Sequence, residues 1–209
     1  MYTLNNLIER YPALESSRQS LEKALDMMIQ SCENDGTLFF CGNGGSASDA
    51  EHIVGELLKD FMIKRPLSTD DQNFLRESFG EEGAYLGNNL QQGIRAIALT
   101  SHPSFNTAIS NDVFADLSFA QQLNCLGKEG DVLMGISTSG NSINVLHAAR
   151  IAKLRGIKVI ALSGKSGGQL AKLSDEAIVV AEDSVPFIQE LHLPIYHWFC
   201  IELERHFFG

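Results

Sequence analysis

The sequence has few basic residues and none of the cysteine patterns that mark several protein classes. Lysine and arginine number 16 against 26 aspartate and glutamate residues, so the formal net charge is −10. Without a basic stripe for a phosphate backbone, nucleic acid is not an expected partner. The four cysteines, Cys32, Cys41, Cys125 and Cys200, form no CxxC pair. Their scatter argues against a disulfide framework or a zinc ribbon and predicts reduced thiols in or near the core.

Long apolar runs are also missing. Nowhere do eighteen consecutive apolar residues occur, and the first residues show no basic leader followed by an apolar run. Neither a membrane span nor a secretory signal is therefore expected. A chain of 209 residues with 44% hydrophobic content can bury one substantial core. We expect one soluble, cytoplasmic domain over residues 1–209.

Short apolar runs alternate with helical patterns along the chain. The predicted strands are 37–42, 94–100, 131–138, 158–164 and 176–181. The predicted helices are 16–29, 46–61, 141–156 and 167–174. This alternation predicts an α/β fold, a three-layer sandwich around a five-stranded, mainly parallel sheet of flavodoxin-like type. Such sheets bind ligands in the loops at the carboxyl ends of their strands.

Two segments depart from this alternation. Residues 64–93 are polar and contain several glycines, with a helical pattern only at 70–79. We interpret them as an insertion that serves as a mobile lid or as an oligomer contact. Residues 186–208 are helix-like but include Pro194, which removes a backbone donor. A kink or a restarted helix is expected there.

The loop after the first strand reads CGNGGSASD, residues 41–49. Gly42, Gly44 and Ala47 match a loose dinucleotide-binding fingerprint, but the acidic residue expected at the end of the next strand is missing. A P-loop is weaker still, because no Gly-Lys-Ser or Gly-Lys-Thr follows. In the simplest alternative the glycines only permit a tight turn, and Asn43 and Ser46 are incidental turn and cap residues.

The loop after the third strand is rich in hydroxyl groups. Ser137, Thr138, Ser139 and Ser142 crowd the start of a predicted helix, where unpaired amides and the helix dipole favour an anion. We interpret this loop as a phosphate site. A plain N-cap serine is the alternative, but it would need only one of the four hydroxyls.

Candidate groups for proton transfer or metal binding lie on two helices. His52 and Glu56 are four residues apart and so share one helix face. They can bind a metal or share a proton, although such a pair is often only a surface ion pair. The last helix adds Gln189, Glu190, His192 and His197, for which the alternative is a structural role. His102, His147 and His206 are interpreted as structural or surface residues.

Five segments in this order resemble the sugar isomerase domain family and, within it, the phosphoheptose isomerases. They are residues 41–57, 109–112, 130–142, 159–171 and 188–197. The resemblance implies the reaction that interconverts sedoheptulose 7-phosphate and D-glycero-D-manno-heptose 7-phosphate through a cis-enediol, for lipopolysaccharide or capsule precursors. Non-catalytic relatives that associate with a replication initiator, and isomerases of other phosphosugars, remain open alternatives.

The resemblance also implies roles for particular residues. The sugar would be bound by Asn43, Gly44, Gly45, Ser46, Asn111, Asp112 and Gln189, and the phosphate by Ser137, Thr138, Ser139 and Ser142. One zinc ion per subunit would be bound by His52, Glu56, Gln189 and His197. For the chemistry we assign Glu56 as general base and His197 as general acid. The family further implies a homotetramer, with residues 1–35 in subunit contacts.

Overall fold

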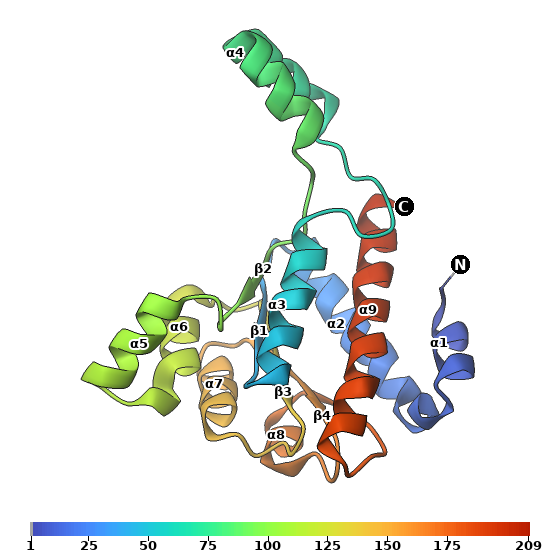
Figure 1. Cartoon of the computed structure of the whole chain (residues 1–209), viewed down its shortest axis with the longest axis vertical. Helices are drawn as coiled ribbons and strands as arrows, with labels where there is room; N and C mark the ends of the chain where they lie inside the picture. The colour runs from blue at the N-terminus through green and yellow to red at the C-terminus, as the bar shows by residue number, and fades with distance from the viewer. Residues whose placement is uncertain (1) are drawn as a thin grey trace.

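A five-stranded sheet runs through the centre of the computed structural model, which describes residues 2–209 (Figure 1). Its strands are β1 (Leu38–Cys41), β2 (Ala96–Ala98), β3 (Val132–Ser137), β4 (Lys158–Ser163) and β5 (Glu176–Val179). The strand order is β2-β1-β3-β4-β5, and every neighbouring pair is parallel. All five predicted strands are confirmed, and the α/β sandwich with them.

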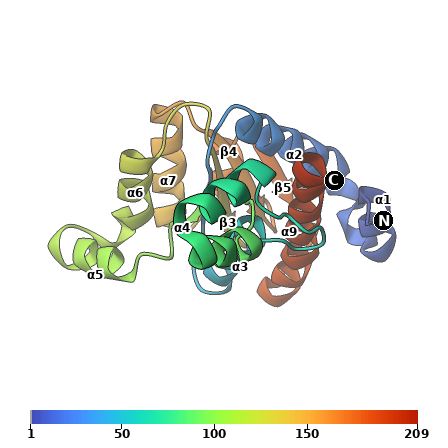
Figure 2. The ribbon, with the colours of Figure 1, turned by 90° about the horizontal axis from the view of Figure 1, so that it is seen from above.

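Helices cover both faces of the sheet, as the view in Figure 2 shows. One face is covered by α1 (Leu4–Arg10), α2 (Arg18–Glu33), α3 (Gly45–Leu58) and α9 (Val185–Phe208). The other is covered by α6 (Ser118–Leu126), α7 (Ile143–Leu154) and α8 (Gly168–Leu173). The remaining elements are α4 (Thr69–Asn89), α5 (Pro103–Asp112), η1 (Pro12–Ser17) and η2 (Ala115–Leu117).

Alternation along the strands divides the core into two clusters. On β1, Leu38 and Phe40 face the α2, α3 and α9 layer, whereas Phe39 and Cys41 face the α6 and α7 layer. All four side chains are buried. Since successive side chains of a strand point to opposite faces, a continuous apolar run is what a strand covered on both sides requires. This rigid sheet positions the loops at its edge.

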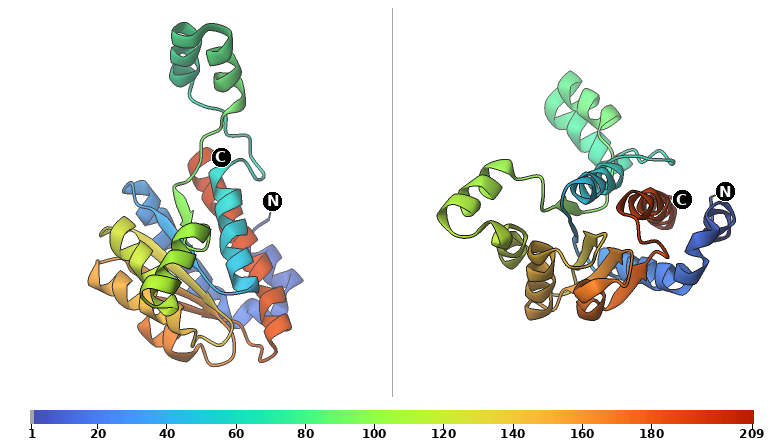
Figure 3. Two further views of the ribbon diagram at one scale, coloured as in Figure 1. Left: turned by 60° about the vertical axis from the view of Figure 1, so that its left-hand side comes forward. Right: turned by 60° about the horizontal axis from the view of Figure 1, so that its bottom comes forward.

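Residues 64–93, which we predicted to be an insertion, contain a helical hairpin that projects from the rest of the chain (Figures 1 and 3). Gly80 has φ 60° and ψ −130°, which divides α4 into two helical arms. The helix predicted at 70–79 is therefore confirmed, but the second arm, up to Asn89, was not predicted. Of the α4 residues, only Gly83 and Gly87 are buried. Its role as lid or oligomer contact stays a prediction.

Helix α9 runs through Pro194 without restarting, so of the two predicted alternatives the restart is wrong, while the kink stays a prediction. Pro194, Ile195, Tyr196 and Trp198 are all buried in its middle, and this packing offsets the lost backbone hydrogen bond. No helix within residues 2–209 is long and apolar enough to span a bilayer.

The amino-terminal segment and the cysteines fall mostly as expected. Residues 2–35 contain α1, η1 and α2, whose apolar side chains join the core beside α9; residue 1 lies outside the described residues. Their role in subunit contacts stays a prediction.

All four cysteines are free. Cys41 and Cys200 are buried and Cys32 is half-buried, but Cys125 is exposed, so its predicted place near the core is wrong.

Candidate active site

The carboxyl ends of β1 and β3 lie side by side at one edge of the sheet, at the bottom of Figure 1. The glycine loop, residues 42–45, follows β1, and the serine loop, residues 137–142, follows β3. The chain continues from β1 to the edge strand β2 and from β3 in the opposite direction to β4. Parallel sheets bind ligands at such a reversal of strand order. The two loops singled out in the sequence therefore lie where this fold places a ligand.

The glycine loop is tied to the start of α7. Gly44 has φ 56° and ψ −121°, a conformation that side chains with a Cβ rarely adopt. The Asn43 amide donates to Asn144 at 2.9 Å and accepts from it at 2.8 Å. Asn144 was missed in the sequence, although it lies two residues after the serine loop. This amide pair fixes the two loops relative to each other.

The serine loop presents its hydroxyl groups at the amino-terminal end of α7. The Ser137 and Ser142 hydroxyls are 3.0 Å apart, and the Ser139 hydroxyl accepts from the Asn141 amide at 3.2 Å. Ser142 occupies the N-cap position, yet within residues 2–209 its side chain caps no backbone amide of α7. The simple N-cap interpretation therefore does not hold for Ser142. The Val145 amide donates to the Asn144 side chain at 3.0 Å, but among residues 2–209 the Ile143 and Asn144 amides at the start of this twelve-residue helix have no partner and can bind an anion.

The loop after β4 holds the serine loop in place. The Gly164 amide donates to the Thr138 carbonyl at 3.2 Å, and the Leu170 amide donates to the Gly140 carbonyl at 2.9 Å. Gly140 has φ 65°, and a Cβ there would overlap the Gly167 carbonyl. The hydroxyl groups are thus held by backbone contacts that a larger residue at 140 would break.

His52 and Glu56 face each other on α3. The distance from His52 Nε2 to Glu56 Oε1 is 3.3 Å, and the Glu56 side chain is only 14% exposed. Glu56 Oε2 accepts from the Lys59 ammonium at 3.0 Å. Lys59 was not identified in the sequence, although its spacing of three residues from Glu56 could have indicated it. The carboxylate is thus largely buried between an imidazole and an ammonium group.

His197 on α9 joins this pair across the helix interface. Its ring centroid lies 5.1 Å from that of His52, at an interplanar angle of 85°. The Nε2 atom of His197 is buried and has no hydrogen-bond partner among the described residues. Burial lowers the pKa of His197, as does the neighbouring His52, while Glu56 acts in the opposite direction. The imidazole is therefore mostly neutral at pH 7 and can accept a proton at one nitrogen and donate at the other.

Tyr196, which contacts His52, and Asp49, which lies near Tyr196, were both missed in the sequence. The Tyr196 hydroxyl lies 3.1 Å from His52 Nδ1. Burial raises the pKa of Tyr196, and so does the nearby Asp49. Burial likewise raises the pKa of Asp49. Tyr196 precedes His197, and Asp49 precedes His52 by three residues, so adjacency to predicted site residues was the available signal.

The remaining predicted sugar-binding residues are Gln189, Asn111, Asp112 and Ser46. Gln189 lies against Gly45, where a Cβ would overlap its side-chain amide. Asn111 and Asp112 end α5, which lies beside α6 (Figures 1 and 3). The Asn111 amide donates to the Asp112 carboxylate at 2.8 Å, and within residues 2–209 neither side chain hydrogen-bonds to the glycine loop. Their sugar-binding role, like that of the buried Ser46, stays a prediction.

The four predicted zinc ligands do not converge within one chain. His52, Glu56 and His197 cluster, but Gln189 lies nearer the amino-terminal end of α9, beside Gly45. Among residues 2–209, no three histidine, cysteine, aspartate or glutamate side chains are placed to hold a metal ion together.

The other histidines are structural or surface residues. His192 is fully buried on α9, which agrees with the structural alternative. His102 contacts Gln122 at 2.6 Å, and His206 contacts Glu33 at 2.9 Å. His147 lies 3.4 Å from Asp116. None of these contacts involves the glycine or serine loop.

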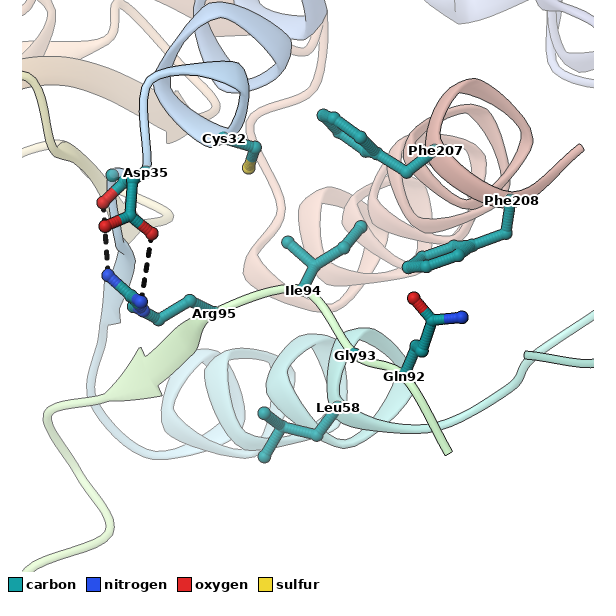
Figure 4. Close-up of a pocket in the computed structure, with 10 residues that line it drawn as sticks. Cys32, Asp35, Leu58, Gln92, Gly93, Ile94, Arg95, Phe207 and Phe208 are labelled. Carbon is teal, nitrogen blue, oxygen red and sulfur yellow. Dashed lines mark hydrogen bonds and ion pairs between the residues drawn. The ribbon is translucent and has the colours of Figure 1, made fainter. Parts of the chain in front are cut away.

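A cavity of about 600 Å³ opens at the opposite end of the sheet (Figure 4). Arg95, which precedes β2, pairs there with Asp35 at 3.0 Å, and Phe207 and Phe208 line the cavity from the end of α9. This is the amino end of the strands, away from the predicted loops. A smaller hollow, of about 400 Å³, includes His197 and Phe61 in its wall. It is this second hollow that adjoins the candidate site.

Comparison with known proteins gives a consistent family. The model of the SIS domain matches residues 3–77 and 77–164. The phosphoheptose isomerase of Helicobacter pylori is 40% identical over 195 residues, covering 93% of this chain and 88% of that protein. The phosphoheptose isomerase of Synechocystis is 36% identical over 190 residues, covering 91% and 84%.

A solved structure agrees with these sequence matches. The phosphoheptose isomerase of Neisseria gonorrhoeae superposes with a TM-score of 0.75 at 33% identity, covering 94% of this chain and 91% of that one. The likeness spans almost the whole chain, so both the fold and the loops at its edge fall within the region compared.

Proposed function

The chain belongs to the SIS domain family, and from this premise we propose that it is a phosphoheptose isomerase that interconverts D-sedoheptulose 7-phosphate and D-glycero-D-manno-heptose 7-phosphate. The observation that supports this most is the cluster of Glu56, His52 and His197, formed between α9 and the helix that follows the glycine loop. It supplies an acid and a base on a helix that starts at the ligand-binding end of the sheet. The activity is that of an aldose-ketose isomerase, acting in heptose precursor synthesis.

Isomerisation moves the carbonyl group between C2 and C1 of the sugar. We assign Glu56 to remove the proton from C1 of the ketose, which forms the cis-enediol, and to return a proton to C2. His197 donates a proton to O2 as that oxygen becomes a hydroxyl and accepts the proton released from O1. Every proton removed is thereby replaced, and the product is an isomer of the substrate. General acid–base catalysis of this kind contributes about 10²–10⁴-fold to the rate.

The two loops would bind the rest of the substrate. We assign the 7-phosphate to the serine loop, because Ser137, Ser139 and Ser142 gather at the helix end that favours an anion. Asn43 and the glycine loop would bind the sugar hydroxyls, since the Asn43–Asn144 pair holds them beside the serine loop. The substrate would then lie across the reversal of strand order, with its reacting end toward α9.

Zinc binding by His52, Glu56, Gln189 and His197 stays a prediction that rests on the family resemblance. Two imidazoles and a carboxylate are ordinary zinc ligands, but as placed within residues 2–209 they do not hold a metal ion together. Metal analysis of protein purified without chelator tests this. Zinc at one per chain supports the prediction, and its absence together with no gain on adding zinc contradicts it.

Assembly and location are also part of the proposal. We propose that the protein is cytoplasmic and forms a homotetramer, as the family resemblance implies. We further propose that subunit contacts complete the site, because His197 borders a hollow of about 400 Å³ that also has Tyr2 and Tyr11 in its wall. Light scattering at assay concentration tests the assembly. A monomer of full activity contradicts it.

An activity screen tests the proposed function. Purified protein is incubated with seven-, six- and five-carbon ketose and aldose phosphates, and isomerisation is followed by NMR. Turnover of sedoheptulose 7-phosphate in preference to the shorter sugars supports the proposal. Turnover of none of them favours a non-catalytic phosphosugar-binding role, and preference for a shorter sugar indicates an isomerase of another phosphosugar.

A further inference from the structure

A fully buried ion pair lies at the end of α3 that carries Glu56. The side chains of Arg65 and Glu204 are both 0% exposed, and Arg65 Nε donates to Glu204 Oε1 at 2.8 Å. Neither residue belongs to the site described above. A buried ion pair is costly to desolvate and is weak evidence for stability by itself, so its presence calls for another explanation.

Each partner of this ion pair is fully engaged. Glu204 also accepts from the backbone amides of Phe61 at 2.8 Å and Met62 at 2.7 Å. The Arg65 guanidinium lies 4.9 Å from the ring centroid of Phe208. Glu204 thus holds both the arginine and the segment that leaves α3, and the arginine is packed against the end of α9.

Arg65 also caps the helix that carries Glu56. Its Nη1 donates to the Leu57 carbonyl at 2.9 Å, and its Nη2 donates to the Glu56 carbonyl at 3.2 Å. The last carbonyls of a helix have no partner within the helix, and a cation at this end is favoured by the helix dipole. One guanidinium therefore joins the backbone of Glu56 itself to Glu204 on α9.

Helices α3 and α9 run in the same direction along each other (Figure 1). Gly45 meets Gln189 at one end, His52 meets His197 in the middle, and Leu57 is joined through Arg65 to Glu204 at the other end. Glu204 follows His197 by seven residues, which is about two helical turns. The ion pair thus joins the end of α3 to α9 two turns beyond His197.

We propose that Arg65 and Glu204 are positioning residues that fix the register of α3 against α9, and thereby place Glu56 relative to His197. This inference rests on the proposed function for its catalytic consequence. The planar guanidinium uses three separate nitrogens to serve one carboxylate and two carbonyls at once. Lysine at position 65 keeps the charge but not this geometry.

The test combines Arg65→Lys, Glu204→Gln and the apolar pair Arg65→Met with Glu204→Leu, with Arg95→Lys as a control in the exposed Arg95–Asp35 pair. Circular dichroism and thermal melting identify the folded variants. For these we expect kcat for sedoheptulose 7-phosphate to fall about 10–100-fold, because a misplacement of about 1 Å can cost 10²-fold. KM should change less than about threefold, because the serine loop is held separately.

Replacing a buried ion pair by apolar residues often leaves a protein folded, so the double variant keeps the test available if a single variant unfolds. Wild-type kcat in a folded double variant would overturn the inference. A crystal structure of Arg65→Lys provides a readout that needs no activity: a shift of Glu56 relative to His197 supports the inference, and unchanged positions refute it. Inactivity of the wild-type protein would refute the proposed function instead.

Discussion

Gly45 and the side-chain amide of Gln189 are in contact where the amino-terminal ends of α3 and α9 meet. A Cβ at position 45 would overlap the amide nitrogen of Gln189. The contact therefore joins the glycine loop to the helix that carries His197, and it leaves no space for any side chain between them.

Gly45→Ala should impair catalysis without unfolding the protein. The overlapping atom is the end of a flexible side chain, so Gln189 can move away while the backbone stays in place. Loss of one correctly placed hydrogen bond costs about 0.5–1.5 kcal/mol, so we expect kcat/KM to fall up to about tenfold. Gly55→Ala is the matched control, because it lies on the same helix and its added Cβ would meet no atom within 4 Å. Equal kinetics for the two variants would argue against a role for Gln189.

Ser137→Ala combined with Ser139→Ala should weaken substrate binding through the phosphate. Hydrogen bonds to charged groups contribute about 1.5–3 kcal/mol each, so KM should rise at least tenfold while kcat changes little. The informative comparison is sedoheptulose, which lacks the phosphate: its poor turnover should be the same in wild type and variant. Ser16→Ala, on the exposed surface of η1, serves as control. An unchanged KM would contradict the assignment of the phosphate to the serine loop.

Stability should fall in mild acid because of His192. Burial lowers the pKa of this fully buried histidine from 6.5 to about 4, so between these values the unfolded chain binds a proton that the folded chain does not. The contribution of this histidine to the free energy of unfolding is therefore fully present above pH 6.5. It decreases by on the order of 3 kcal/mol as the pH falls toward 4. Urea unfolding at pH 7, 5.5 and 4.5 measures it. His192→Leu should lose less stability over this range, and an identical loss would contradict the assignment.

The strands could be predicted from the sequence because a sheet covered on both faces needs continuous apolar runs. On β1 the apolar run is unbroken, because Phe39 and Cys41 are buried on one face and Leu38 and Phe40 on the other. The second arm of α4 could not be predicted, because Gly83 and Gly87 weaken its helical pattern and only two of its residues are buried. The helix restart predicted at Pro194 is wrong because the packing of α9 outweighs the local cost of the lost backbone hydrogen bond.

The candidate site could be predicted in part. His52 and Glu56 follow from spacing along one helix, and their contact at 3.3 Å confirms that they face each other. Tyr196 and Asn144 could not be identified in the same way, because their contacts depend on which helices and loops meet, whereas the spacing of Lys59 from Glu56 could have indicated it. Arg65 was visible only as part of an Arg-Pro pair, and nothing in the local sequence indicates that Glu204, 139 residues later, lies beside it.

Removal of the helical hairpin should leave the core folded. At its base, the Gln92 amide donates to the Arg65 carbonyl at 2.8 Å, and Pro66 pairs with Gln91. Replacing residues 67–90 by an Asn-Gly turn keeps these contacts. We expect Tm to fall by no more than about 2–4 °C, equivalent to 1 kcal/mol.

The same deletion separates the two interpretations of the hairpin. A lower molar mass by light scattering would identify it as an oligomer contact. An unchanged mass with altered kcat or KM would identify it as a lid. Loss of cooperative unfolding would contradict its description as a separate projection.

The most direct test of the proposed chemistry is the kcat of wild type and Glu56→Gln with sedoheptulose 7-phosphate, measured by NMR on protein of verified fold. Glutamine keeps the size of the side chain but cannot accept the C1 proton. The proposed mechanism predicts turnover by the wild type and a decrease of about 10²–10⁴-fold in the variant. Wild-type turnover by Glu56→Gln, or none by the wild type, would contradict it.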